Sequence, residues 1–150
     1  MKASDGEETL AKSEPDGMNK APLANGEVRR QLGLKLRAHD TCNVVYVMWH
    51  VEPTPGIYVS VKHNLGQSTH SECGDHGYTN LKPEVSAPVA ALHEGEQHSL
   101  RAWIEGSRLI VSADGAVVWK GQLPSETWTF DGPVGLRSDN AIFDVRLTTL

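Results

Sequence analysis

Apolar residues recur at every second position over much of this chain, and a period of two is typical of β-strands with one buried face. Three leucines alternate with polar residues between positions 28 and 37. Residues 43–52 are apolar on both faces, which indicates a central strand that is covered on each side. A Pro-Thr-Pro-Gly turn follows at 53–56, and the apolar residues of 57–61 share one face. Together these segments predict an antiparallel meander.

A second meander is predicted over 98–121, where alternating segments are separated by two tight turns. The turns are Gly106-Ser107 and Asp114-Gly115, and the Asp-Gly pair strongly favours a type I′ hairpin. The three strands are expected at 98–105, 108–113 and 116–121.

The remaining segments extend this all-β pattern. Residues 81–93 are rich in Pro and Ala and predict an irregular edge strand. A turn at 131–133 leads through 134–136 towards a last strand with Ile142, Phe143, Val145 and Leu147. Many short strands joined by Gly- and Pro-rich turns predict a β-sandwich or a barrel. The aromatic residues expected in its core are Trp49, Trp119, Trp128 and Phe143.

The first 26 residues have a different composition. They are rich in Asp, Glu, Ser, Lys, Gly and Pro and contain no aromatic residue, so they cannot bury enough surface to offset the entropy of ordering. We therefore predict a disordered acidic leader at 1–26 and one β-sandwich domain at 27–150. Such a leader is expected after removal of a secretory signal, and a disordered cytosolic tail would have the same composition.

Charge and hydropathy narrow the range of partners. The chain has 14 Lys and Arg against 19 Asp and Glu, a net charge of −5, and it shows no basic patch that would favour nucleic acid. Its longest apolar run, 44–49, is far shorter than the roughly 20 residues that span a bilayer. We therefore expect neither a nucleic-acid partner nor a membrane span, and the oligomeric state is left open.

The two cysteines bear on the cellular compartment. Cys42 and Cys73 could close one disulfide, worth about 3 to 4 kcal/mol in the loop-entropy model. A disulfide would place the protein outside the reducing cytosol, in an extracytoplasmic or secreted location. The alternative is two unrelated buried thiols, which a cytoplasmic protein could equally have.

Two segments resemble a known family. HSLRAWIEGSRLIVSADGAVVW (98–119) and GPVGLRSDNAIFDVRL (132–147) resemble the C-terminal half of concanavalin A-like jelly-roll domains of the laminin-G type, nearest to the 3-keto-disaccharide hydrolase domain family. The resemblance covers roughly the last third of the chain and implies an antiparallel concanavalin-like β-sandwich. The family's Trp-x-x-Leu-Phe-Asn-Gly opening is missing and the domain is shorter, so no catalytic residue is carried over.

The segment HNLGQSTHSECGDHGY at 63–78 concentrates groups that could carry chemistry. His63, His70, Cys73 and His76 follow the spacing H-x6-H-x2-C-x2-H, which only a coiled loop could gather around zinc. Structural zinc sites usually contain paired cysteines, and a disulfide would remove Cys73 as a ligand. We therefore expect no metal, and no motif implies a cofactor.

Acid–base catalysis is a second possibility for this region. The candidate catalytic residues are His50, His63, His70, His76 and Asp75. A nucleophilic Ser68 or Ser71 would need an oriented base, and no Gly-x-Ser-x-Gly elbow is present. Glu72 with Asp75 or Glu105 could serve glycoside hydrolysis, although nothing in their spacing selects them. The simplest alternative is a polar loop whose side chains bond its own backbone.

Three strand faces combine aromatic and hydrogen-bonding side chains. The faces are Tyr46, Met48 and His50, then Tyr58, Ser60 and Lys62, and finally Arg101, Trp103 and Glu105. On one sheet they would form a groove suited to a sugar ring, because Tyr and Trp offer flat apolar surfaces with polar tips. Otherwise they are ordinary half-exposed sheet. The expected ligand-binding residues are Tyr46, His50, Tyr58, Lys62, His63, Asn64, Gln67, His70, Glu72, Tyr78, Arg101, Trp103 and Glu105.

These patterns lead to one principal functional hypothesis and two alternatives. The principal hypothesis is a carbohydrate-binding β-sandwich module without catalysis, whose ligand is a saccharide or another small polar molecule. The first alternative is an enzyme acting on saccharides, a glycoside or 3-keto-glycoside hydrolase or lyase that uses loop histidines. The second alternative is a structural or protein-interaction module.

Overall fold

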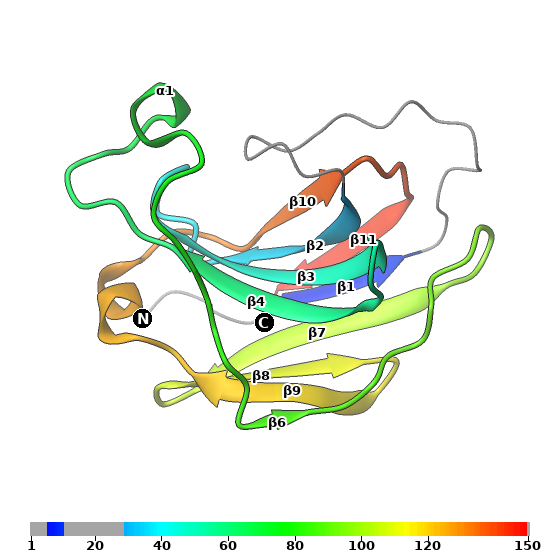
Figure 1. Cartoon of the computed structure of the whole chain (residues 1–150). Coiled ribbons are helices and arrows are strands. Elements are labelled where there is room, and N and C mark those ends of the chain that lie inside the picture. The colour runs from blue at the N-terminus through cyan, green and yellow to red at the C-terminus, as the bar shows by residue number, and fades with distance from the viewer. Residues whose placement is uncertain (1–5, 11–28, 150) are drawn as a thin grey trace.

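The computed structural model describes residues 6–10 and 29–149, and it is a sandwich of two antiparallel β-sheets (Figure 1). This confirms the predicted all-β fold. In chain order the elements are β1 (Gly6–Leu10), β2 (Arg30–Leu36), β3 (Val44–Glu52), β4 (Gly56–Lys62), α1 (His70–Cys73), β5 (Tyr78–Asn80), β6 (Val85–Ser86), β7 (His98–Glu105), β8 (Arg108–Ala113), β9 (Ala116–Gln122), the 3-10 helix η1 (Ser125–Thr129), β10 (Gly135–Asp139) and β11 (Val145–Thr149). Among these described residues, no helix has the length and apolar character needed to cross a bilayer.

The five-stranded sheet has the order β10-β2-β3-β4-β5 and contains the first predicted meander. β3 is its central strand, and Val44 to His50 are all buried, as its apolar sequence predicts. Gly33 of β2 stands between Arg137 of β10 and Met48 of β3 in the register. A Cβ atom at Gly33 would collide with the backbone of Val47, so the close approach of β2 and β3 requires glycine.

The six-stranded sheet has the order β11-β1-β7-β8-β9-β6 and contains the second meander. Its β8–β9 turn has positive φ at both Asp114 (51°) and Gly115 (85°), as a type I′ turn requires. β6 is short and lies at the edge, within the segment 81–93 that was predicted as an irregular edge strand.

β1 differs from the prediction of a disordered leader at 1–26. Its five residues pair with β7 on one side and with β11 on the other, and Glu8 stands opposite both Leu100 and Leu147. Pairing along both edges satisfies the backbone donors and acceptors whatever the polarity of the side chains, which composition does not capture. Residues 1–5 and 11–26 of the predicted leader lie outside the described residues.

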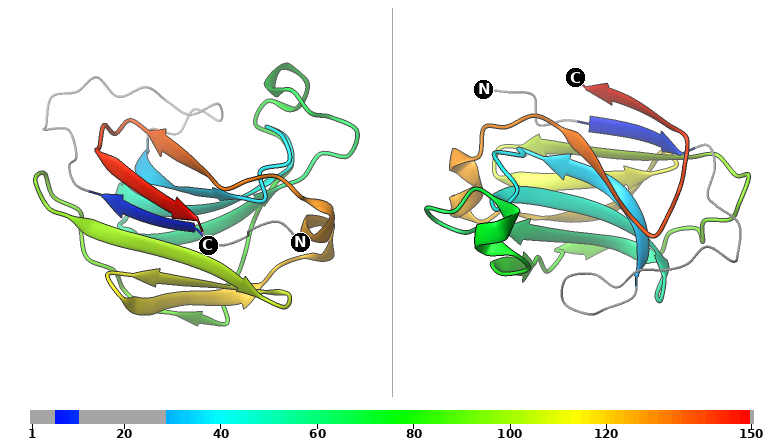
Figure 2. Two further views of the ribbon diagram at one scale, coloured as in Figure 1. Left: turned by 180° about the vertical axis from the view of Figure 1, so that it is seen from behind. Right: turned by 90° about the horizontal axis from the view of Figure 1, so that it is seen from above.

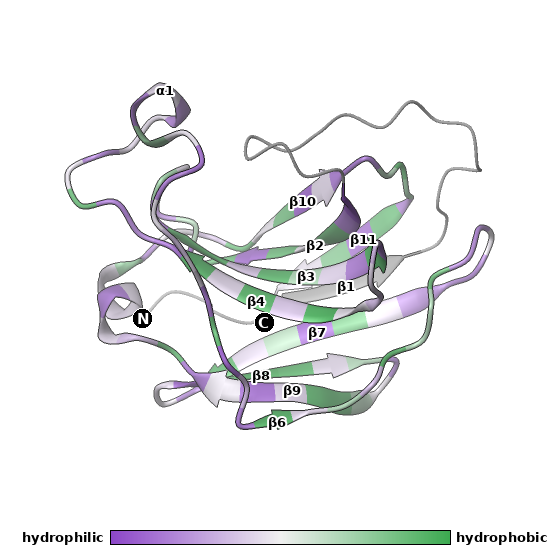
Figure 3. Cartoon of the chain, in the orientation of Figure 1, coloured by the Kyte–Doolittle hydropathy of each residue, from purple (hydrophilic) through white to green (hydrophobic). Residues whose placement is uncertain are grey.

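The hydrophobic core fills the space between the two sheets. Residues that are at most 2% exposed alternate along the strands of both sheets, and they include Leu34, Val47, Trp49, Leu100, Val111 and Trp119. Figure 3 shows this alternation as green bands along the strands. The indole Nε1 of Trp49 donates to the carbonyl oxygen of Ala90 at 3.2 Å, so its polar atom is satisfied inside the core.

Two predictions about the C-terminal part were wrong. Trp128 was expected in the core, but it lies on η1 and is 60% exposed, because this helix directs Thr127 inward instead. The last strand was expected to include Ile142 and Phe143, but β11 contains only Val145 and Leu147 of the four expected residues, and a separate strand, β10, precedes it in the other sheet. Figure 2 shows that η1 lies at the same end of the sandwich as α1 and its loop.

Candidate functional site

The outer face of the five-stranded sheet, which points away from the other sheet, carries a groove of about 830 Å³. Strands β2, β3, β4, β5 and β10 all contribute to it, and so does the loop at 63–78. The residues that line it include Gln31, Tyr46, Met48, His50, Tyr58, Ser60, Lys62, His70, Gly74, Asp75, Tyr78, Asn80, Arg137 and Asp139. Successive residues of a strand point to opposite faces. Because the leucines and valines of these strands point into the core, the polar and aromatic residues between them point into the groove.

Tyr58 forms an exposed aromatic surface in this groove. Its ring lies 3.9 Å from the imidazole of His50, centroid to centroid, with 17° between the planes. Tyr58 is 42% exposed, whereas His50 is buried on the central strand. The buried ring therefore supports the exposed one.

Tyr78 forms a second exposed surface, with 41% of its area accessible. Its ring centroid lies 6.0 Å from that of the buried Tyr46. The guanidinium of Arg137 lies over the Tyr46 ring at 4.6 Å, and its Nη1 donates to the Tyr78 hydroxyl oxygen at 3.5 Å. Arg137 can reach Tyr46 from β10 because the intervening residue of β2 is Gly33, which has no side chain.

Asp139 connects the β10 end of the groove to its floor. Its Oδ2 accepts from Gln31 Nε2 at 2.6 Å and from Arg137 Nε at 3.0 Å. Burial alone would lower the pKa of Arg137, but the carboxylate of Asp139, with Tyr78 and Tyr46, raises it above its usual value. Burial, and then the neighbouring Tyr78, raises the pKa of Tyr46 to about 12. Arg137 is thus a fixed cation and Tyr46 a neutral phenol at physiological pH.

Lys62 lies at the other end of the floor, where β4 meets the loop. Its side chain is buried, with 2% of the residue exposed. Nζ donates to the carbonyl oxygen of Gly74 and lies 5.0 Å from the centroid of the Tyr78 ring. The groove therefore contains a lysine ammonium held against the wall that the loop provides.

A disulfide between Cys42 and Cys73 fixes this loop, which confirms the predicted bond. Cys73 ends α1, and Gly74 follows with a φ of 51°. At the start of α1, Glu72 Oε1 accepts from the Thr69 hydroxyl at 2.8 Å and from the backbone N–H groups of Thr69 and Ser68. These hydrogen bonds, the hydroxyl first, lower the pKa of Glu72. Glu72 thus caps a helix.

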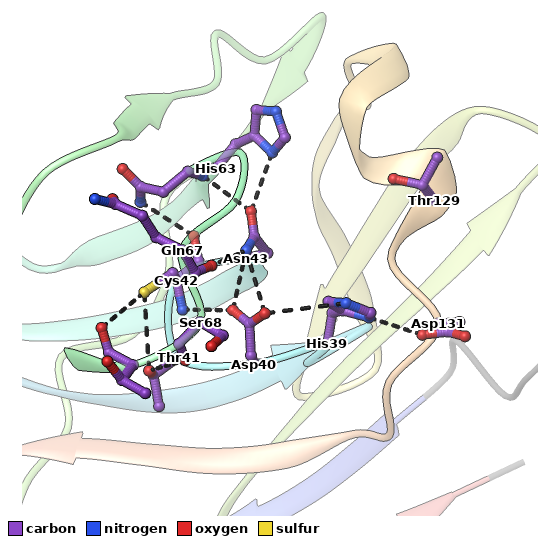
Figure 4. A network of polar contacts seen from close by, with 12 residues as sticks. His39, Asp40, Thr41, Cys42, Asn43, His63, Gln67, Ser68, Thr129 and Asp131 are labelled. Carbon is purple, nitrogen blue, oxygen red and sulfur yellow. Dashed lines mark hydrogen bonds and ion pairs between the residues drawn. The ribbon is translucent and has the colours of Figure 1, made fainter. Parts of the chain in front are cut away.

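Asn43 makes the second attachment of the loop (Figure 4). Its Oδ1 accepts from the backbone N–H of Asn64 at 2.9 Å and lies 3.1 Å from His63 Nδ1. Its Nδ2 donates to the Gln67 carbonyl oxygen at 2.9 Å and to Asp40 Oδ1 at 3.0 Å. Asn43 is 7% exposed, so one buried amide connects three parts of the loop to the segment before β3.

The structure divides the expected ligand-binding residues into three groups. Those that line the groove are Tyr46, His50, Tyr58, Lys62, His70 and Tyr78. Those that stand in the loop without lining the groove are His63, Asn64, Gln67 and Glu72, and all four make contacts that hold the loop. The loop therefore both contributes to the groove and ties down the sandwich.

The third group corrects the expectation that three strand faces share one sheet. Arg101, Trp103 and Glu105 belong to β7, in the six-stranded sheet, so they lie on the opposite outer face of the sandwich. Leu100 and Ala102 of this strand point into the core. The three outward residues contact one another: the Arg101 guanidinium lies 4.8 Å from the Trp103 ring, and Trp103 Nε1 donates to Glu105 at 3.1 Å.

The candidate catalytic residues are also divided. His50, His70 and Asp75 line the groove, whereas His63 contacts Asn43 and Phe130. Exposed His76 has its Nε2 3.8 Å from Asp75 Oδ1. The sulfur of Cys73 is bound to Cys42 and is no metal ligand, and the described residues contain no group of three or more His, Cys, Asp or Glu side chains placed to hold a metal ion.

Several groove residues were not expected from the sequence. Gln31, Asn80, Arg137 and Asp139 come from β2 and from the two edge strands, β5 and β10. The one available signal was the alternation of 28–37, which places Gln31 on the face opposite the leucines. Nothing in the sequence paired β10 with β2, because more than a hundred residues separate Gln31 from Asp139.

Comparisons with known proteins bear on the fold. No protein-family model matches the chain, and no curated protein matches it by sequence. Among solved structures, the carbohydrate-binding module CBM66 from Bacillus subtilis is similar with a TM-score of 0.58 and 13% identity, over 99% of this chain and 72% of that one. The homodimeric agglutinin CG-16 from chicken liver is similar with a TM-score of 0.53 and 6% identity, over 98% of this chain and 92% of that one. A tetrameric galectin from the ball sponge Cinachyrella is similar with a TM-score of 0.53 and 14% identity, over 99% of this chain and 92% of that one. The chain therefore has the jelly-roll sandwich fold of these proteins.

Proposed function

We propose that the groove on the five-stranded sheet binds a saccharide and that the protein is a carbohydrate-binding module without catalysis. The observation that carries the proposal is the pair of exposed rings, Tyr58 at 42% and Tyr78 at 41%, inside a groove with hydrogen-bonding side chains. A sugar ring offers an apolar C–H face and a rim of hydroxyl groups. Flat aromatic rings match the first, and groups such as Gln31, Ser60 and Asn80 match the second.

The structural neighbours support this proposal. A carbohydrate-binding module, an agglutinin and a galectin have the same fold as this chain. Fold alone does not determine function, so the proposal depends on the groove and its residues.

The experiment is a glycan array followed by calorimetric titration of the saccharides that bind. Tyr58→Ala and Tyr78→Ala should each weaken binding about tenfold or more, because a buried aromatic contact is typical of an interface hot spot. Trp128→Ala removes an aromatic residue that is more exposed than either tyrosine and lies outside the groove, so it should leave affinity unchanged. Trp103→Ala tests the opposite face. If binding is lost in Trp103→Ala and kept in both tyrosine variants, the groove is the wrong site.

Enzymatic use of the same groove stays a separate prediction, because His50, His70 and Asp75 line it. The finer resemblance to 3-keto-disaccharide hydrolase domains likewise stays a prediction. Turnover of 3-keto-glycosides or aryl glycosides, abolished in His70→Ala, would support an enzyme over a binding module.

We also propose an extracytoplasmic or secreted location. The disulfide between Cys42 and Cys73 supports it, because such bonds persist in oxidising compartments. Thiol labelling of the protein taken from its native source should leave both cysteines unmodified until a reductant is added. Labelling without reductant would contradict the proposal.

A further inference from the structure

We propose that the saccharide of this groove is anionic, and that Lys62 together with Arg137 binds its carboxylate or sulfate group. This inference depends on the proposed function and names the class of its ligand. It starts from an imbalance: the floor of the groove contains a buried cation that no carboxylate of the described residues neutralises in an ion pair.

The surroundings of Lys62 define this cation. Lys62 is the last residue of β4 and stands between Val44 and Tyr78 in the register. An ammonium group has three N–H donors, and within the described part of the chain only the Gly74 carbonyl oxygen accepts from it. Burial of a charge without an opposite charge is energetically unfavourable. A ligand oxygen that carries negative charge would supply the missing partner.

Arg137 brings a second cation to the same place. Its Nη1 lies 3.5 Å from the hydroxyl oxygen of Tyr78, while Lys62 Nζ lies 5.0 Å from the centroid of the Tyr78 ring. Both cations therefore lie beside the same exposed aromatic ring. A sugar ring stacked on Tyr78 would bring a carboxylate or sulfate substituent within reach of both, where charge-assisted hydrogen bonds are the stronger kind.

The anionic groups of the groove do not cancel this charge. Asp139 accepts from both Gln31 and Arg137, and Asp75 has its carboxylate beside exposed His76. Among the described residues that line the groove, neither of these two carboxylates forms an ion pair with Lys62.

The net charge of the chain distinguishes a charged sugar from a more highly charged anion. A highly charged polymer such as nucleic acid would be repelled by the acidic chain outside the groove. A saccharide with one charged group per ring places its charge beside Lys62 and its apolar face on a tyrosine. We therefore assign the site to a carboxylated or sulfated saccharide.

The test uses matched pairs of probes in which one member is anionic and the other is neutral. Oligogalacturonate is compared with its methyl ester, and a sulfated dextran oligosaccharide with the unsulfated form, by calorimetric titration at low and high NaCl. One anionic probe should bind about tenfold or more tighter than its neutral partner, which corresponds to roughly 1.4 kcal/mol. The difference should shrink as salt screens the charges. A difference in affinity within the galacturonate pair would indicate a carboxylated ligand, and a difference within the dextran pair would indicate a sulfated one.

Variants connect this preference to Lys62. Lys62→Met keeps the apolar stem and removes the charge, so it should abolish the preference, whereas Lys62→Arg should keep it. Lys120→Met is the matched control, because Lys120 lies on β9 in the other sheet and changes the net charge equally. If Lys62→Met does not fold, the salt dependence and the probe pairs in the unaltered protein still decide.

Two outcomes would overturn the inference and differ from each other. If neutral and charged members of both pairs bind equally well, the ligand is a neutral saccharide and the proposed function survives. If neither member of any pair binds and the glycan array is empty, the proposed function fails together with the inference.

Discussion

The ring of Tyr58 lies nearly parallel to the imidazole of His50, with 3.9 Å between their centroids. The histidine is buried on the central strand and the tyrosine is exposed on the next strand, so the buried ring orients the exposed one. A ring that is oriented before the ligand arrives loses less conformational freedom on binding, and this favours affinity.

His50→Ala should therefore weaken saccharide binding, although His50 is itself buried. Stacked aromatic pairs are worth about 0.5 to 1.5 kcal/mol beyond their buried area, so the expected loss is roughly two- to tenfold. His50→Phe should retain most of the affinity. Calorimetric titration with a saccharide from the array measures both, and His93→Ala, at an exposed loop residue, is the control. Equal affinity in wild type and a folded His50→Ala would show that the stack plays no part.

Loss of the disulfide should destabilise the domain by about 3 to 4 kcal/mol, because the bond closes a loop of 31 positions. Urea unfolding with and without reductant measures this free energy. The double variant Cys42→Ser with Cys73→Ser should match the reduced wild type. Saccharide affinity should also fall, because Gly74 and Asp75 follow Cys73 directly and line the groove. A double variant as stable as the oxidised protein would contradict this prediction.

Asn43→Ala should lower the free energy of unfolding by about 1 to 3 kcal/mol, because it leaves partly buried groups of His63, Asn64 and Gln67 without their hydrogen bonds. Thr79→Ala, at an exposed position of β5, should change stability little and serves as the control. Urea unfolding of the two variants provides the comparison, and equal effects would mean that Asn43 does not hold the loop.

Because the pKa of Tyr46 is raised in the folded state, the domain should become less stable at alkaline pH. Burial, then Tyr78, raises its pKa from 10.0 to about 12, so the folded state favours the neutral phenol. This contribution is complete below the unfolded pKa of 10.0 and is lost as the pH rises to about 12. Urea unfolding over this interval should show a steeper decline for wild type than for Tyr46→Phe. Parallel declines would show that another group controls the alkaline transition.

Much of the architecture could be predicted because it is local. The alternation of leucines in β2, the apolar run of β3 and the Asp114-Gly115 turn each determine their element within a few residues. The same alternation indicates that Tyr46 and His50 share one face of β3. The pairing of β3 with β4 then places Tyr58 on the same face of the sheet.

The remaining parts depend on pairing between distant strands. Alternation shows which residues of β7 point outward, but not to which sheet β7 belongs. For this reason Arg101 and Trp103 were expected in the groove, although they lie on the opposite outer face of the sandwich. Arg137 was missed because its strand joins β2 across roughly a hundred residues. β1 was missed because its residues are polar and its backbone pairing leaves no trace in composition.

The most direct test of the central claim is the change in backbone amide chemical shifts when labelled protein is titrated with a saccharide from the array. We predict shifts along β3, β4, β5 and β10 and in the loop at 63–78, including Tyr58, Tyr78 and Arg137. Shifts confined to β7 and β8 around Trp103, or no shifts with any saccharide, would contradict the claim that this groove binds sugar.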